Sequence, residues 1–145
     1  MGDNYKHSDI TNRIIKCYYA VYNTLGFGFL EKVYEKALLL ELKKSGLVCS
    51  PQYPIDVYYD EINVGQYFAD IIVNECVIIE IKAAEALCEE HEAQLVNYLK
   101  ATNIEVGLLL NFGKQAEFKR KVFSSQYKII SNHNDHKNQR AITPN

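Results

Sequence analysis

The stretch FADIIVNECVIIEIK, residues 68–82, contains two apolar runs with Asn74-Glu75 between them. Turn-forming residues between two runs rich in Val and Ile predict a hairpin, with strands at about 64–73 and 76–82. The second run is apolar on both faces, which is typical of a strand that is covered on both sides. We therefore expect this hairpin to form the centre of a sheet.

The residues after this hairpin predict a helix and further strands. A polar helix is expected at about 89–102, and EVGLLLN, residues 105–111, predicts a second buried strand. Because a helix separates the two buried strands, they are expected to pair in parallel through a right-handed crossover. Residues 116–123 alternate in the manner of an edge strand, and a last short strand is expected near 128–130.

Two helices are expected before the hairpin. Apolar residues at steps of three and four predict the first helix, which ends at Leu25, and Ser8 or Asp9 can cap its start. Gly26 stands where a left-handed residue would end this helix. A second helix, rich in Leu, Glu, Lys and Ala, is expected at about 30–44.

A strand is also expected at about 55–59, and Pro51 and Pro54 restrict the residues before it to a loop or a sheet edge. The order helix, helix, three strands, helix, strand, strand predicts an α/β fold with a mixed β-sheet flanked by helices. The chain of 145 residues is expected to form one domain over residues 1–130, followed by a polar, disordered tail at 131–145.

The composition excludes several classes of protein. The net charge of −2 argues against a strongly basic nucleic-acid coat, but it does not exclude an enzyme that holds DNA through a local basic patch. The four cysteines form no C-x-x-C pair, so neither a zinc nor an iron–sulfur site is expected. A polar N-terminus and the lack of a long apolar run predict a cytoplasmic protein with no signal peptide and no contact with a membrane.

Three charged residues interrupt the most apolar strands. Asp70 lies in the first strand of the hairpin, and Glu80 and Lys82 lie in the second. Burying such charges is costly unless they are paired or bind a metal ion. Since alternate residues of a strand share a face, Glu80 and Lys82 point to the same side, and the neighbouring strand brings Asp70 to them.

This set of side chains suits a hard cation. Mg²⁺ prefers oxygen ligands and keeps several waters, so two carboxylates can anchor it while its open positions accept phosphate oxygens and a water. Lys82 could then position or deprotonate that water, or stabilise the phosphorus centre. The alternative is that Asp70, Glu80 and Lys82 form a structural ion network, or lie at strand ends in water.

The register of the hairpin makes the catalytic interpretation more specific. With a two-residue turn at Asn74-Glu75, paired residue numbers add up to 149, and Asp70 would face Ile79. Asp70 faces Glu80 only if the numbers add up to 150, which requires an odd loop such as 74–76, or a bulge. A catalytic site therefore predicts an irregular hairpin.

Two helices contribute further candidates. Gln94 and Tyr98 are four residues apart and share a helical stripe. Gln94 could hold a phosphate or the water, and Tyr98 could bond a phosphate or stack; the alternative for Tyr98 is a half-buried tyrosine with a solvated hydroxyl. Gly28, Glu31 and Tyr34 recur every three residues of the second helix region, where the helix dipole alone would favour Glu31.

Several motifs in this order resemble those of a known family. Gly28-Phe-Leu-Glu31-Lys-Val-Tyr34 resembles the signature of the GxxExxY protein family, a bacterial and archaeal branch of the PD-(D/E)XK nuclease superfamily. Asp70 followed by Glu80-Ile81-Lys82 resembles the D…ExK motif of that superfamily, and Gln94-Leu-Val-Asn-Tyr98 resembles the Q-x-x-x-Y motif of its exonuclease-like branch. The resemblance covers roughly residues 8–124.

The resemblance implies a core of helix, three-stranded meander, helix and strand. It implies that Asp70 and Glu80 bind Mg²⁺ or Mn²⁺ and that Lys82 is catalytic. Glu31 would be a further acidic residue of the metal and catalytic site, which Gln94 and Tyr98 would line. Ala69 stands where the superfamily motif has its proline, a position that varies in the superfamily.

These residues lead to one main hypothesis and two alternatives. The main hypothesis is a metal-dependent deoxyribonuclease, with a basic, DNA-facing rim formed by Lys114, Lys119, Arg120, Lys121 and Lys128. A solvated edge strand is the alternative for this rim. The alternatives for the function are a catalytically silent module that binds nucleic acid or a protein, and an enzyme that hydrolyses RNA or a smaller phosphodiester. A homodimer, or a place in a larger repair or defence complex, is compatible with each.

Overall fold

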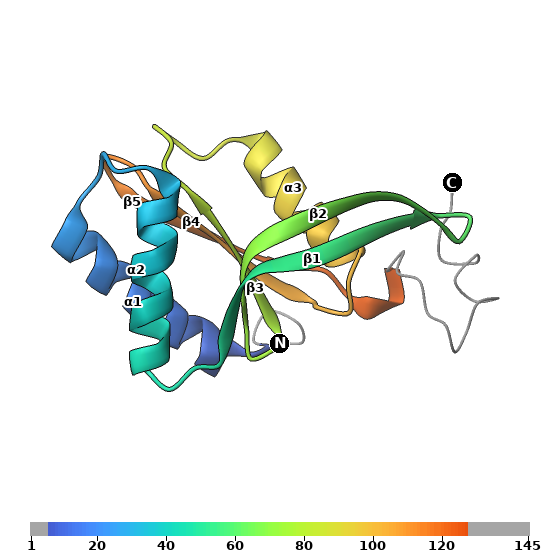
Figure 1. Ribbon diagram of the computed structural model, residues 1–145, viewed down its shortest axis with the longest axis horizontal. Coiled ribbons are helices and arrows are strands. Elements are labelled where there is room, and N and C mark those ends of the chain that lie inside the picture. Colours follow the sequence, from blue (N-terminus) through green and yellow to red (C-terminus); the bar gives the residue numbers. More distant parts are fainter. Residues whose placement is uncertain (1–5, 128–145) are drawn as a thin grey trace.

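The structure is a computed structural model and describes residues 6–127 (Figure 1). Its elements, in chain order, are α1 (Ser8–Leu25), α2 (Glu31–Lys44), β1 (Cys49–Tyr59), β2 (Ile62–Val73), β3 (Val77–Lys82), α3 (Glu89–Lys100), β4 (Val106–Phe112), β5 (Ala116–Val122) and a 3₁₀ turn (Ser125–Tyr127). The strand expected near 128–130 and the tail expected at 131–145 lie outside the described residues. No described helix is long and apolar enough to cross a bilayer.

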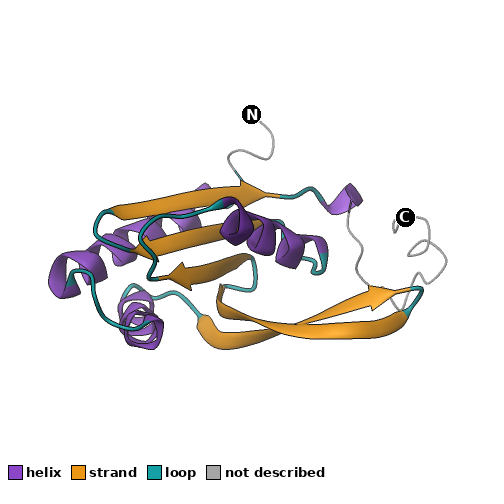
Figure 2. Cartoon of the chain, turned by 90° about the horizontal axis from the view of Figure 1, so that it is seen from above, coloured by secondary structure: helices purple, strands orange, loops and turns teal. Residues whose placement is uncertain are grey.

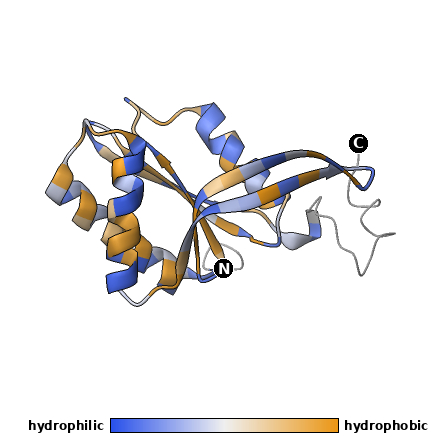
Figure 3. Cartoon of the chain, viewed as in Figure 1, coloured by the Kyte–Doolittle hydropathy of each residue, from blue (hydrophilic) through white to orange (hydrophobic). Residues whose placement is uncertain are grey.

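The five strands form one mixed sheet in the order β1-β2-β3-β4-β5. Only β3 and β4 pair in parallel, as expected from the helix between them, and the other neighbours are antiparallel. Helices α1 and α2 pack on one face and α3 packs on the other (Figure 2). Hydrophobic residues are concentrated in the central strands, whereas α2 and α3 carry many hydrophilic ones (Figure 3). The predicted α/β class is confirmed.

The strand boundaries differ from the prediction mainly in β1. This strand begins at Cys49 rather than near residue 55, and it includes both Pro51 and Pro54. Because β1 is at the edge of the sheet, it can contain residues without a backbone N–H. The edge position, which was one of the two expected from these prolines, is therefore confirmed.

The start of α1 also differs from the prediction. Neither Ser8 nor Asp9 caps the helix, because the helix begins at Ser8 and His7 occupies the capping position without a side-chain hydrogen bond. At the other end, Gly26 has a φ of 68° and its N–H donates to the Tyr22 carbonyl over 2.8 Å. Gly26 therefore ends α1 at the expected position, but its ψ of −156° differs from that of the expected left-handed cap.

The β2–β3 hairpin has the irregular turn that the register argument requires. Its pairs are Ile71 with Ile79, Ile72 with Ile78 and Val73 with Val77, so the numbers add up to 150 and the loop contains residues 74–76. Asn74 and Glu75 both have positive φ values, 50° and 55°. The predicted odd loop is confirmed. It places Asp70 opposite Glu80, directly after the last regular pair, Ile71 with Ile79.

The part of β2 before Asp70 does not pair with β3, so it leaves the sheet together with β1 as a two-stranded arm (Figure 1). Ala69 and Ile72 belong to the same α3-side core, although strict alternation would place them on opposite faces. Strand β2 therefore turns at Asp70. Opposite this turn, between the pairs of Pro51 with Ile71 and Tyr53 with Ala69, Gln52 has a φ of 55°.

Candidate active site

Asp70 and Glu80 bind each other's strands through their carboxylates. The Asp70 backbone N–H donates to Glu80 Oε2 over 2.8 Å, and the Ile81 N–H donates to Asp70 Oδ2 over 2.7 Å. Each side chain thus accepts a strand N–H at the place where the regular pairing stops. Hydrogen bonds of this length fix both carboxyl groups in position.

Glu80 is buried and Asp70 is half-buried, and this changes their titration. Only 5% of Glu80 is exposed, and burial followed by repulsion from Asp70 raises the pKa of Glu80 to about 8. Burial also raises the pKa of Asp70, against the hydrogen bond from Ile81. Within the described chain, neither carboxylate forms an ion pair. Two neighbouring acids that are shielded from water and form no ion pair create a position where bound positive charge is favourable.

Lys82 and two residues of α3 face this pair. Lys82 lies on the same side of β3 as Glu80, and its charge acts against the raised pKa of both carboxyl groups. Its Nζ donates to Gln94 Oε1 over 3.4 Å. Tyr98 is 6% exposed, and burial followed by the charges of Glu80 and Asp70 raises its pKa to about 12. The structure thus brings together five of the predicted site residues.

Glu31 approaches the pair from the start of α2. Its Oε2 accepts the Ala83 N–H over 3.3 Å, directly after Lys82, and its charge contributes to the raised pKa values of Asp70 and Glu80. Glu31 is therefore close to the pair, but its carboxylate is engaged with the backbone.

Tyr34 holds the loop that positions Glu31. Its hydroxyl donates to the Gly26 carbonyl over 2.7 Å and accepts the Phe29 N–H over 3.1 Å, while its ring stacks on Phe112 at 4.2 Å. Gly28 within this loop has a φ of 112°, which side chains rarely adopt. Gly28 thus allows the turn of the loop, Glu31 carries the carboxylate near the pair, and buried Tyr34 holds the loop by hydrogen bonds.

Two residues near the pair were missed by the sequence analysis. Glu35 is only 7% exposed, and its charge raises the pKa of Asp70. Gln52, opposite Asp70, donates to Glu35 Oε2 over 3.2 Å. The signal for Glu35 was its position, four residues after Glu31 on the helix face that also buries Leu38. Gln52 had no such signal, because its position depends on the bend of β1.

Asn111 at the end of β4 was also missed. It is 1% exposed, its Nδ2 donates to the Ala84 carbonyl over 3.0 Å, and its Oδ1 accepts the Ala84 N–H over 2.9 Å. This two-way bond fixes the loop that leaves β3 after Lys82. An asparagine at the end of an apolar strand was the available signal.

The carboxylate pair fits Mg²⁺ or Mn²⁺. Among residues 6–127, no three His, Cys, Asp or Glu side chains are close enough to hold a metal by themselves. Magnesium needs only one or two carboxylates, because waters and substrate phosphates complete its octahedron, whereas structural zinc needs four protein ligands. Asp70 and Glu80 can provide this anchor. The role of Glu31 as a further ligand stays a prediction.

The predicted basic rim does not form one surface. Lys119 and Lys121 are two residues apart along β5 and share one face of the sheet, whereas Arg120 between them points to the other face. Lys121 pairs with Glu92 over 2.6 Å, and Arg120 donates to the Lys6 carbonyl. Lys114 is the member of this set that borders a hollow together with Glu31. Lys128 lies outside the described residues.

Replacing Glu80 tests the buried pair without metal. In EDTA, folded Glu80 keeps its proton up to about pH 8, whereas the unfolded chain releases it near the ordinary value of 4.5. The free energy of unfolding should therefore fall as pH rises between these values, by on the order of a few kcal/mol. Glu80→Gln should remove this fall and be more stable than the wild type at pH 8. Urea denaturation against pH measures it.

The control for this experiment is Glu89→Gln, which changes an exposed carboxylate at the start of α3. It should keep the pH dependence of the wild type. The burial argument is contradicted if Glu80→Gln and the wild type lose stability equally as the pH rises.

Gly113→Ala tests the loop after Lys82. A Cβ at this position would lie 2.3 Å from the Ala84 carbonyl oxygen, so the loop would have to move. We expect a loss of about 1–3 kcal/mol in stability from this overlap. At Gly65 a Cβ meets only an ordinary contact at 3.7 Å, so Gly65→Ala should change stability by less than about 1 kcal/mol. Equal denaturation midpoints for both variants would contradict this account of the loop.

The family comparison agrees with this geometry. A family model described as the PD-(D/E)XK nuclease superfamily matches residues 8–122. The crystal structure of SSO0001 has a similar fold, with a TM-score of 0.51 and 22% identity over 63% of this chain, and this chain covers 48% of that one. A comparison with curated proteins gave no significant match. Since the family model covers most of its length, the chain belongs to the PD-(D/E)XK nuclease superfamily.

Proposed function

We propose that this protein is a nuclease that hydrolyses phosphodiester bonds in DNA with Mg²⁺ or Mn²⁺ as its cofactor. The observation that carries the proposal is the pair of half-buried Asp70 and buried Glu80, which forms no ion pair among the described residues. A stable fold gains little from a buried acid beside a half-buried acid that repels it, so their placement favours a ligand that compensates their charge.

Asp70 and Glu80 would hold the cation through the oxygens that do not accept backbone N–H groups, Oδ1 and Oε1. When bound, such an ion neutralises charge on the phosphate and lowers the pKa of a coordinated water. The two backbone hydrogen bonds keep the carboxylates in position before the substrate arrives. This arrangement avoids the cost of ordering flexible side chains.

Lys82 supplies a positive charge from the protein beside the two carboxyl groups. Its side chain is half-buried and held by Gln94, so its ammonium would stay beside the carboxylates and either position the attacking water or stabilise the charge that develops on the phosphate. Tyr98, with a pKa of about 12, keeps its proton at neutral pH and would donate a hydrogen bond to a phosphate oxygen.

Finer parts of the proposal rest on the motifs. We assign the chain to the prokaryotic GxxExxY branch on Gly28, Glu31 and Tyr34, and we take DNA over RNA from the same resemblance. All four cysteines lie in the described part and form no disulfide, which supports a reducing, cytoplasmic location.

A second candidate is a catalytically silent module that binds nucleic acid or a protein. The observation that favours it is the lack of a third carboxylate grouped with Asp70 and Glu80 in residues 6–127. A binding module needs neither a metal nor Lys82 for its function, and this separates the two candidates.

A nuclease assay tests the proposal. The full chain is incubated with single- and double-stranded DNA in Mg²⁺, Mn²⁺ or EDTA. Cleavage should require the metal and fall by about 100-fold or more in Asp70→Asn and in Lys82→Ala, because each removes charge stabilisation at the reacting phosphate. Asp60→Asn at the exposed tip of the arm is the matched control and should cleave as the wild type does.

The two candidates give different results. Cleavage that persists in EDTA, or that is unchanged in Asp70→Asn, would contradict the proposed site. DNA binding without any cleavage in either metal would favour the silent module.

A further inference from the structure

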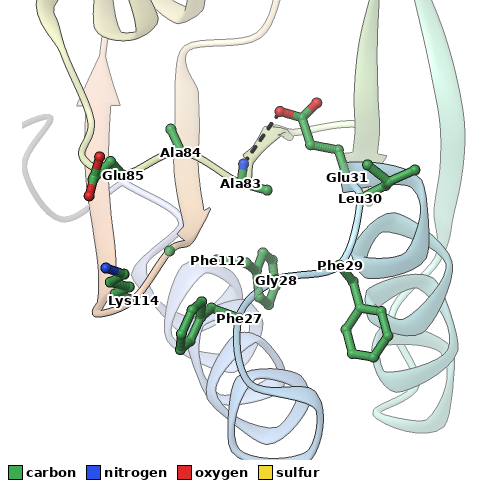
Figure 4. Close-up of a pocket in the computed structure, with 11 residues that line it drawn as sticks. Phe27, Gly28, Phe29, Leu30, Glu31, Ala83, Ala84, Glu85, Phe112 and Lys114 are labelled. Atoms are coloured by element: carbon green, nitrogen blue, oxygen red, sulfur yellow. Dashed lines mark hydrogen bonds between the residues drawn. The ribbon is translucent and has the colours of Figure 1, made fainter.

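A hollow of about 640 Å³ adjoins the proposed site (Figure 4). It lies between the loop before α2, the loop after β3 and the turn between β4 and β5. Glu31, whose charge reaches the carboxylate pair, belongs to its wall, as do Phe27, Ala84, Phe112 and Lys114. This volume is within the range of about 300–1,000 Å³ that small-ligand sites have.

Phe27 is exposed in this hollow without a structural reason. Its exposed fraction is 54%, and none of the described aromatic rings packs against it. Phe29, two residues on, is equally exposed at 49%, but its ring packs edge-on against Tyr34 at 6.1 Å. In Figure 4 the Phe29 ring points away from Lys114, whereas Phe27 lies on the side of Lys114.

Single exposed phenylalanines are common, so exposure alone indicates nothing. Here the exposed ring shares a hollow with a cation, Lys114, and with a residue of the proposed site, Glu31. Aromatic rings that alternate with cations bind single-stranded nucleic acid, because bases stack on the rings and phosphates pair with the cations. Glu85 also belongs to the wall of this hollow, so an uncharged base suits the hollow better than a phosphate at any position other than Lys114.

We propose that this hollow binds an unpaired nucleobase of the strand whose phosphate lies at Asp70 and Glu80, with the base stacked on Phe27 and an adjacent phosphate at Lys114. This inference rests on the proposed function and specifies its substrate as single-stranded or frayed nucleic acid. A base within a duplex would have to leave its stack to enter, which costs free energy.

Oligonucleotide binding tests the subsite. The full-length protein is titrated in EDTA with a fluorescent oligothymidylate and with an abasic strand of equal length, and anisotropy gives the dissociation constants. Phe27→Ala should weaken binding of the oligothymidylate by about 5- to 100-fold, since one stacked base is lost. It should leave binding of the abasic strand unchanged. Lys114→Ala should weaken binding of both strands, because both carry the phosphate.

Two variants control for the loop itself. Phe29→Ala changes the same residue type in the same loop and should bind both strands as the wild type does. Phe27→Trp keeps a ring for stacking and should restore the preference for the strand with bases. Phe27 is mostly exposed, so urea denaturation should show the same midpoint for Phe27→Ala and the wild type.

Three results would overturn the subsite: unchanged binding in Phe27→Ala, an equal loss for the abasic strand, or no binding of oligothymidylate by the wild type. Binding of a blunt duplex as tight as that of the single strand would overturn the preference for unpaired bases. Metal-dependent cleavage together with any of these results removes only the subsite. Base-dependent binding through Phe27 without cleavage removes only the proposed hydrolysis.

Discussion

The end of the β2–β3 pairing is the constraint on which the rest of the site depends. A three-residue turn fixes the register so that Asp70 and Glu80 follow the last regular pair, Ile71 with Ile79. There each carboxylate accepts an N–H of the opposite strand. With a turn shorter by one residue, Glu80 would no longer lie opposite Asp70, and one of the two hydrogen bonds between a carboxylate and the opposite strand would be lost. The turn therefore determines whether two carboxyl groups can meet at one point of an otherwise apolar sheet.

The helices complete the site from both faces of the sheet. Helix α2 brings Glu31, and Tyr34 of the same helix fixes the loop before it through hydrogen bonds. Helix α3 brings Gln94 and Tyr98 over the opposite face of the sheet. The loop after Lys82 is fixed by Asn111, which bonds both backbone groups of Ala84. None of these contacts is an ion pair with Asp70 or Glu80. The molecule thus keeps both acids in place, and the proposed cation would compensate their charge.

Much of this was predictable from the sequence, for physical reasons. Strand alternation and helical spacing are local rules, so the shared faces of Glu80 with Lys82 and of Gln94 with Tyr98 followed from residue numbers. The odd turn followed because paired residue numbers in a hairpin have a constant sum. Glu35 and Gln52 were missed because their contact requires β1 to bend opposite Asp70, a tertiary effect. The basic residues of β5 were grouped as one rim, although the same alternation rule separates Arg120 from its neighbours.

Counting bound Mn²⁺ by electron paramagnetic resonance tests the central claim most directly. The account predicts one site in the wild type that binds more tightly at about pH 8 than at about pH 6, because the cation must displace the proton held by Glu80. Asp70→Asn should lose this site, and Asp60→Asn at the tip of the arm should keep it. Equal Mn²⁺ binding in the wild type and in Asp70→Asn, or binding that does not change with pH, would contradict the account.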